Sequence, residues 1–262
     1  MVAGIELIDI TPDNVMDFGF CFCSDPDSEK FKKKLEWFLK NYPLGLRYRV
    51  LFSRQEKTFV GMIEYIPGSF AWRGIRAQDY MVIHCLMVKK GYSGKGLGSD
   101  LIEACLAEAK EAGLAGVAAV CTRKTWCTDT RIYLKNGFEV VDKAAPGLEL
   151  VARKISPTES PSFGNQDEKM EPYRESVYMF YSGQCPYMSG GEKFFQRKEM
   201  LRTRFDVESR VIELKNPEDA QNNPCGWGTY GIIANGKVLN HVPGGCRGFL
   251  QGLKKQKIIG DL

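Results

Sequence analysis

The pattern of apolar and polar positions predicts a mixture of strands and helices over the first part of the chain. The segment 80–88 is a nearly continuous apolar run, typical of a strand that is covered on both faces. Other segments alternate with the period of a strand or place apolar residues on one face of a helix. The pattern predicts strands over 46–53, 58–66, 80–88 and 115–121, and helices over 28–41 and 98–112.

A stretch rich in proline and serine, 156–172, interrupts this pattern and predicts a linker between two domains. Beyond it the order is strand, helix, strand, hairpin and helix, with Asn235-Gly236 as the hairpin turn. The segments are 177–181, about 189–204, 209–214, 229–241 and 246–257. We therefore expect an α/β chain with a mixed central sheet in residues 1–155 and a smaller α/β domain in residues 173–262.

Composition indicates a folded chain, with 44% hydrophobic and 26% charged residues among 262. No run of about 18 apolar residues predicts a membrane span, and no signal-like segment opens the sequence, so we expect a cytoplasmic protein. Lys and Arg number 23 against 23 Asp and Glu in residues 1–172, and 13 against 9 afterwards. This modest excess argues against nucleic acid as a partner. Nine scattered cysteines without a C-x-x-C pair give no reason to expect a bound metal.

The segment 88–98 joins the buried strand to the following helix and contains Gly91, Gly94, Gly96 and Gly98. Glycines let the backbone approach a ligand closely, and N–H groups at a helix N-terminus suit phosphate oxygens. The spacing matches neither a Rossmann fingerprint nor a P-loop. On spacing alone, the loop is either a phosphate cradle or a plain glycine-rich turn.

The order of these features over residues 5–154 resembles the GNAT N-acetyltransferase superfamily. Ser93-Gly94-Lys95-Gly96-Leu97-Gly98 follows the buried strand, and a segment from Ile132 to Asp142 carries Tyr133 and Gly137-Phe138. The resemblance implies a GNAT fold and acetyl-CoA as cosubstrate. It also implies a set of cofactor-binding residues, although Ser93 stands where the family usually has Gln or Arg. The set is Leu86, Met87, Val88, Ser93, Gly94, Lys95, Gly96, Leu97, Gly98 and Tyr133.

Tyr133 occupies the position where many members of that family place the acid that protonates the departing thiolate, so it is either that acid or a residue packed beneath the cofactor. Amine acetylation also needs a base. His84 lies two residues from Leu86, which predicts the same strand face, and Glu64 has apolar neighbours that could raise its pKa. Tyr65, Trp72, Arg73 and Arg76 either shape an acceptor site or belong to an ordinary solvated hairpin.

The second domain places Cys185 between a strand and a helix, where a helix dipole can lower the pKa of a thiol. This domain looks like a thioredoxin-fold relative, and its pairing with the first resembles GNAT proteins with a YoaP-like C-terminal domain. Met188 stands where a C-x-x-C motif has its second, resolving cysteine. Cys225 or Cys246 would therefore have to supply the second thiol of a redox cycle. Cys185 is thus either a reactive redox thiol, with Cys225 as a candidate second redox cysteine, or a residue with a structural role only.

These observations lead to an acetyl-CoA-dependent N-acetyltransferase that acts on a small-molecule amine by direct attack, as a monomer or homodimer. A thiol-handling protein that uses Cys185 is the alternative, with the first domain as a CoA-binding module. A degenerate module that senses acetyl-CoA or binds RNA remains a third reading.

Overall fold

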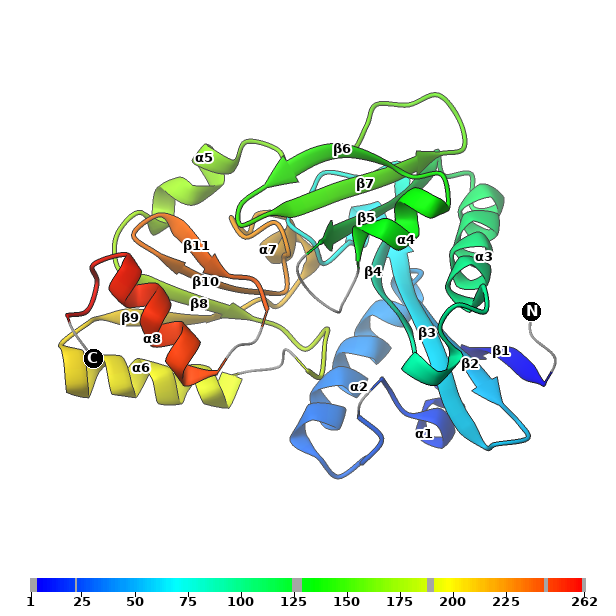
Figure 1. The fold of residues 1–262 in the computed structure, drawn as a ribbon, viewed down its shortest axis with the longest axis horizontal. Helices are drawn as coiled ribbons and strands as arrows, with labels where there is room; N and C mark the ends of the chain where they lie inside the picture. The colour runs from blue at the N-terminus through cyan, green and yellow to red at the C-terminus, as the bar shows by residue number, and fades with distance from the viewer. Residues whose placement is uncertain (1–3, 22, 124–128, 188–190, 243–244, 261–262) are drawn as a thin grey trace.

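The computed structural model describes residues 4–21, 23–123, 129–187, 191–242 and 245–260. It contains a seven-stranded sheet in the order β1-β2-β3-β4-β5-β7-β6 and a four-stranded sheet in the order β11-β10-β8-β9. The two sheets lie side by side, with helix α2 near the boundary between them (Figure 1). In the described part of the chain, no helix is both long and apolar enough to cross a membrane.

The large sheet is mixed, because only β4 and β5 pair in parallel. Its strands are β1 (Ile5–Ile10), β2 (Arg47–Ser53), β3 (Thr58–Pro67), β4 (Tyr80–Val88), β5 (Gly116–Thr122), β6 (Glu139–Ala144) and β7 (Leu148–Lys154). The helices of this half are α1 (Val15–Phe18), α2 (Glu29–Asn41), α3 (Leu97–Glu111) and α4 (Thr130–Lys135). Strands β1, β6 and β7 and helices α1 and α4 were not predicted from the sequence pattern, whereas the other strands and helices of this half match their predicted ranges closely.

Helices α2 and α3 cover opposite faces of the large sheet. Trp37 and Phe38 of α2 belong to one core cluster, and Leu101 and Cys105 of α3 belong to the other. Helix α2 begins at Glu29 because Ser28 caps it, its hydroxyl accepting a hydrogen bond from the Phe31 N–H at 3.3 Å. The sheet is therefore buried on both faces, as the apolar run of β4 predicted.

Strand β4 is irregular in its C-terminal half, the part of the strand that borders the cavities described below. Its parallel pairing with β5 ends at Ile83↔Ala119, so the two strands diverge beyond that pair. On its other side the register runs from Glu64↔Cys85 to Tyr65↔Ile83, which leaves His84 as one extra residue. A bulge of this kind redirects the side chains that follow it.

The small sheet combines one parallel pair, β8 with β9, and antiparallel pairs of β10 with β8 and of β11 with β10. Its strands are β8 (Val177–Tyr181), β9 (Ser209–Glu213), β10 (Tyr230–Ala234) and β11 (Lys237–Asn240). The helices of this half are α5 (Gln166–Met170), α6 (Gly191–Phe205), α7 (Pro217–Gln221) and α8 (Cys246–Lys255). The predicted hairpin forms at Asn235-Gly236, and Asn235 has the positive φ of 46° that such a turn requires.

The two sheets share a hydrophobic core. One cluster of buried residues contains Trp37 from the large-sheet half and Phe180 from the small-sheet half. The segment predicted as a linker takes part in this packing: Phe163 is buried, and a Cβ atom on Gly226 would come within 2.5 Å of its ring. Residues 156–172 are therefore held against the folded body of the protein.

Candidate active site

The glycine loop and the N-terminus of α3 border a cavity of about 380 Å³, here called the loop cavity. Gly94 and Gly96 have φ values of +81° and +82°, which side chains rarely adopt, and a Cβ atom at either would meet only open space. Gly98 lies close to α4, because a Cβ atom there would come 2.5 Å from Ile132 Cδ1, so that side chain would have to move. The loop therefore lines the cavity with backbone that carries no side chain at Gly94, Gly96 and Gly98.

Helix α3 begins without a side-chain cap, since its N-cap residue is Gly96. In the described part of the chain, the backbone N–H groups of residues 94–98 donate to no other residue. A row of such donors at the positive end of a 15-residue helix is a site for phosphate oxygens. This favours the phosphate cradle over the plain turn.

Helix α4 and the residue after it form another wall of the loop cavity with Arg131, Lys135 and Asn136. The sequence analysis did not single out these three as site residues, although they lie within three positions of Tyr133. Tyr133 itself is fully buried and packs edge-on against Phe138, with ring centroids 5.3 Å apart. It lines neither cavity among the described residues, so the structure supports the packing role and the acid role stays a prediction.

A second, smaller cavity of about 50 Å³ lies on the α2 side of the sheet, here called the interface cavity. The two cavities border neighbouring residues of β4: Leu86 and Met87 line the interface cavity, and Val88 lines the loop cavity. Both halves of the chain contribute walls to the interface cavity. Its residues are Phe20, Cys21, Lys34, Tyr48, Met62, Glu64, Cys85, Leu86, Met87, Gln184, Cys185, Pro186 and Tyr187.

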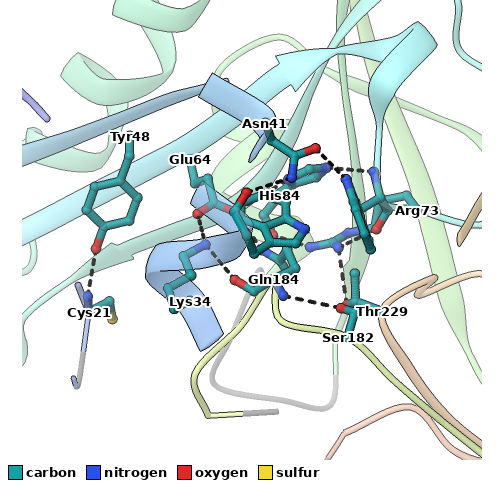
Figure 2. Close-up of polar contacts among 12 residues, drawn as sticks. Cys21, Lys34, Asn41, Tyr48, Glu64, Arg73, His84, Ser182, Gln184 and Thr229 are labelled. Carbon is teal, nitrogen blue, oxygen red and sulfur yellow. Dashed lines mark hydrogen bonds and ion pairs between the residues drawn. The ribbon is translucent and has the colours of Figure 1, made fainter. Parts of the chain in front are cut away.

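A buried network joins three elements at the interface cavity (Figure 2). The Lys34 ammonium on α2 pairs with Glu64 Oε2 on β3 and donates to the Gln184 carbonyl at 2.5 Å. The Gln184 side-chain amide donates to Glu64 Oε1 at 2.6 Å. All three residues are at most 3% exposed, so the charges are compensated by contact rather than by water.

His84 faces the α2 side of the sheet, whereas Leu86 joins the core cluster on the α3 side. The prediction that these two residues share a face was wrong, because the extra residue in β4 shifts the alternation by one. His84 Nε2 accepts a hydrogen bond from the Trp72 N–H at 3.0 Å, so the proton of neutral His84 sits on Nδ1, 3.4 Å from Glu64 Oε1. His84 does not line either cavity among the described residues.

The electrostatics of the network hold Glu64 ionised and His84 neutral. Burial by itself would raise the pKa of Glu64, but the Lys34 ammonium and the contact from His84 lower it to about 2. Burial lowers the pKa of His84 to about 4. The expected rise in the pKa of Glu64 was therefore wrong, because the sequence pattern did not show that Lys34 faces it.

The residues proposed to shape an acceptor site have structural positions instead. Tyr65 donates to Glu108 at 2.7 Å, and the Trp72 indole donates to Asn41 at 2.9 Å. The buried Arg73 guanidinium donates to the carbonyl of the bulged His84 and stacks 5.0 Å from the Trp227 ring, while Arg76 is exposed. None of the four lines the interface cavity among the described residues.

The eight described cysteines are thiols, and the structure groups three of them: Cys21, Cys85 and Cys185 line the interface cavity. Burial raises the pKa of Cys21, and the nearby Cys85 and Cys185 raise it further. Cys225 is fully buried, and burial raises the pKa of its thiol to about 12. No group of three or more His, Cys, Asp or Glu side chains in the described part of the chain is arranged to hold a metal ion.

Met188 and the two residues after it lie outside the described residues, and α6 begins at Gly191. The predicted helix-terminus effect on Cys185 stays a prediction. Lys34 and Gln184 were also missed in the sequence. Lys34 follows Lys32 and Lys33 in a helix, and such a run normally marks a solvated face.

Residues 13–138 match the family described as "Acetyltransferase (GNAT) family". The chain is 28% identical over 239 residues to "Uncharacterized N-acetyltransferase YoaP" of Bacillus subtilis (strain 168), covering 89% of this chain and 92% of that protein. Among solved structures, PaiA N-acetyltransferase of Thermoplasma acidophilum in complex with coenzyme A is 17% identical, with a TM-score of 0.42, covering 57% of this chain and 98% of that one. Spermidine N-acetyltransferase of Vibrio cholerae, in complex with CoA and spermine, is 14% identical, with a TM-score of 0.42, covering 58% and 96%.

Proposed function

Because the chain carries a domain of the acetyltransferase (GNAT) family over residues 13–138, we propose that it transfers an acetyl group from acetyl-CoA to the amine of a small molecule. One observation carries this proposal: two cavities of different character border the divergent end of β4. The loop cavity suits the phosphates of the cofactor. The interface cavity is proposed to hold the amine.

The cofactor would bind through the backbone of the glycine loop. The N–H groups of residues 94–98 suit the pyrophosphate, and Lys95 with Lys135 adds positive charge near it. Beyond Ile83, β4 has no pairing with β5, so its backbone edge can hydrogen-bond the pantetheine arm at Leu86 and Val88. The bulge at His84 then places the next side chains, Cys85 and Met87, on the acceptor side.

In the reaction, the neutral amine attacks the thioester carbonyl, a C–N bond forms, and the C–S bond breaks. Tyr133 is proposed to protonate the departing thiolate. Glu64 is the better placed of the two base candidates because it lines the interface cavity. A carboxylate with a pKa of about 2 is a poor base for an ammonium group, so the ammonium is proposed to give its proton to water before attack, and the second amine proton passes to water as the tetrahedral intermediate collapses. Glu64 is proposed to orient the neutral amine by accepting a hydrogen bond from it.

The test is an assay of CoA release by the purified full-length chain with acetyl-CoA and a panel of primary amines. Acetyl-CoA binding is measured separately by calorimetry. We expect micromolar to millimolar cofactor affinity and amine-dependent CoA release. Cofactor binding without release for any amine would contradict the transferase, and absence of binding would contradict the loop cavity as the cofactor site.

A second candidate function is thiol chemistry at Cys185. The small sheet follows the element order strand, helix, strand, helix, hairpin, helix, with β8 between β9 and β10, which supports the thioredoxin-like reading of this half. Cys185 follows the central strand β8, and Cys21 and Cys85 share its cavity. These two thiols are better placed as its partners than the fully buried Cys225.

A further inference from the structure

We propose that the second domain completes the amine site, and that the acceptor is a small primary amine with a short apolar chain. This inference rests on the proposed acetyltransferase function. It concerns the loop of residues 182–187, called the closing loop, which joins β8 to α6. Four residues of this loop, Gln184 to Tyr187, line the interface cavity opposite β4.

The closing loop is tied to the site by Gln184. Its backbone carbonyl accepts from Lys34 at 2.5 Å, and its side-chain amide donates to Glu64 Oε1 at 2.6 Å. The Ser182 hydroxyl accepts from the Gln184 N–H at 3.3 Å, which fixes the turn of the loop (Figure 2). Gln184 is thus a positioning residue, because it aims the carboxylate that is proposed to bind the amine.

The closing loop is also fixed against the first domain by close backbone contacts. A Cβ atom on Gly183 would lie 3.0 Å from the Lys33 carbonyl and 3.2 Å from Trp37 Cβ. Elsewhere on the same interface, the Gly74 N–H donates to the Gly226 carbonyl at 3.2 Å, and a Cβ atom on Gly228 would lie 2.4 Å from Arg73 Cα. Interfaces packed this closely hold a wall of the site in one position.

The size and lining of the interface cavity restrict the acceptor. The interface cavity is small, with a volume of about 50 Å³. Phe20, Met62 and Met87, with the thiols of Cys21 and Cys85, make most of the wall apolar. The buried Glu64 is the one carboxylate among the lining residues, and the Lys34 ammonium at the same cavity balances its charge, so the cavity offers a hydrogen-bond acceptor for one amino group. The additional ammonium groups of a polyamine would find no further carboxylate among these lining residues, whereas a monoamine with a short apolar chain needs only one polar contact.

The experiment compares isobutylamine with spermidine as acceptors of the full-length chain, with CoA release as the readout. We expect kcat/KM for isobutylamine to exceed that for spermidine at least 10-fold. Gln184→Met keeps the length of the side chain but removes the hydrogen bond to Glu64. It should raise KM for isobutylamine about 10-fold or more, because hydrogen bonds to charged groups are strong, and leave the acetyl-CoA Kd unchanged. Gln196→Met, on the exposed face of α6, is the matched control.

A second variant keeps the proposal testable if Gln184→Met folds poorly. Tyr187 is 53% exposed at the cavity, so Tyr187→Ala should fold and widen the site, raising kcat/KM for hexylamine relative to isobutylamine. Preference for spermidine, or equal KM values in Gln184→Met and Gln196→Met together with unchanged selectivity in Tyr187→Ala, would overturn the inference while leaving the transferase intact. Cofactor binding with no acetylation of any amine would overturn the proposed function, and the inference with it.

Discussion

Replacing Lys34 by Met should destabilise the protein strongly, because it removes one partner of a fully buried ion pair. Lys34 is 2% exposed and Glu64 1% exposed. The network lowers the pKa of Glu64 from 4.5 to about 2. At 1.36 kcal/mol for each pKa unit, this corresponds to about 3 kcal/mol of stability. Breaking a buried pair by removing one partner costs a comparable 3–5 kcal/mol, roughly.

The stability difference between the wild type and Lys34→Met should depend on pH, because the protonation of Glu64 is coupled to folding. The pKa of Glu64 is lower in the folded than in the unfolded chain, so its stabilisation is fully present above about pH 4.5. It is lost as the pH falls from about 4.5 towards 2. The stability difference between the wild type and Lys34→Met should therefore be largest at neutral pH and shrink on acidification.

Thermal and urea unfolding of both proteins between pH 7 and pH 3 measure this difference. At pH 7 we expect the Tm of Lys34→Met to fall by about 10 °C, given roughly 2–4 °C for each kcal/mol in a chain of this size. Lys32→Met places the same substitution on the exposed side of the same helix and should change Tm little. Equal Tm values for the two variants, or a difference that stays constant down to pH 3, would refute the reasoning.

Three further predictions concern the cofactor loop, Tyr133 and the cysteines. Gly96→Ala and Gly113→Ala both place a side chain at positive φ in open space, at opposite ends of α3, so each should cost about 1–2 kcal/mol in urea unfolding. Only Gly96→Ala should weaken acetyl-CoA binding in calorimetry; equal Kd values would exclude a role of the loop. Tyr133→Phe should lower kcat while leaving the acetyl-CoA Kd unchanged, and unaltered turnover would leave Tyr133 a packing residue. Peptide mapping after brief iodoacetamide treatment at pH 7 should show Cys185 labelled ahead of Cys105 and Cys121, whose pKa values burial raises; labelling no faster than theirs would contradict a reactive Cys185.

The sequence by itself determined the features that depend on neighbours along the chain. The apolar run of β4, the glycine loop before α3 and the Asn235-Gly236 hairpin are local patterns, and each forms where it was predicted. The glycines that border the loop cavity follow for the same reason, because backbone geometry at a strand–helix junction is set by a few consecutive residues. Strands β6 and β7 were missed because their residues are only partly apolar and β7 inserts between β5 and β6 in the sheet.

Only the tertiary structure decided the residues that come together at the interface cavity. Lys34, Glu64 and Gln184 are separated by 30 and 120 positions along the chain, and no local pattern pairs them. The bulge at His84 depends on the register between β3 and β4, so alternation along β4 alone gave the wrong face for His84. Cys21, Cys85 and Cys185 come together because the closing loop packs on α2. The charge state of Glu64 follows from those same contacts, since burial and a facing ammonium act on a pKa only when folding brings them together.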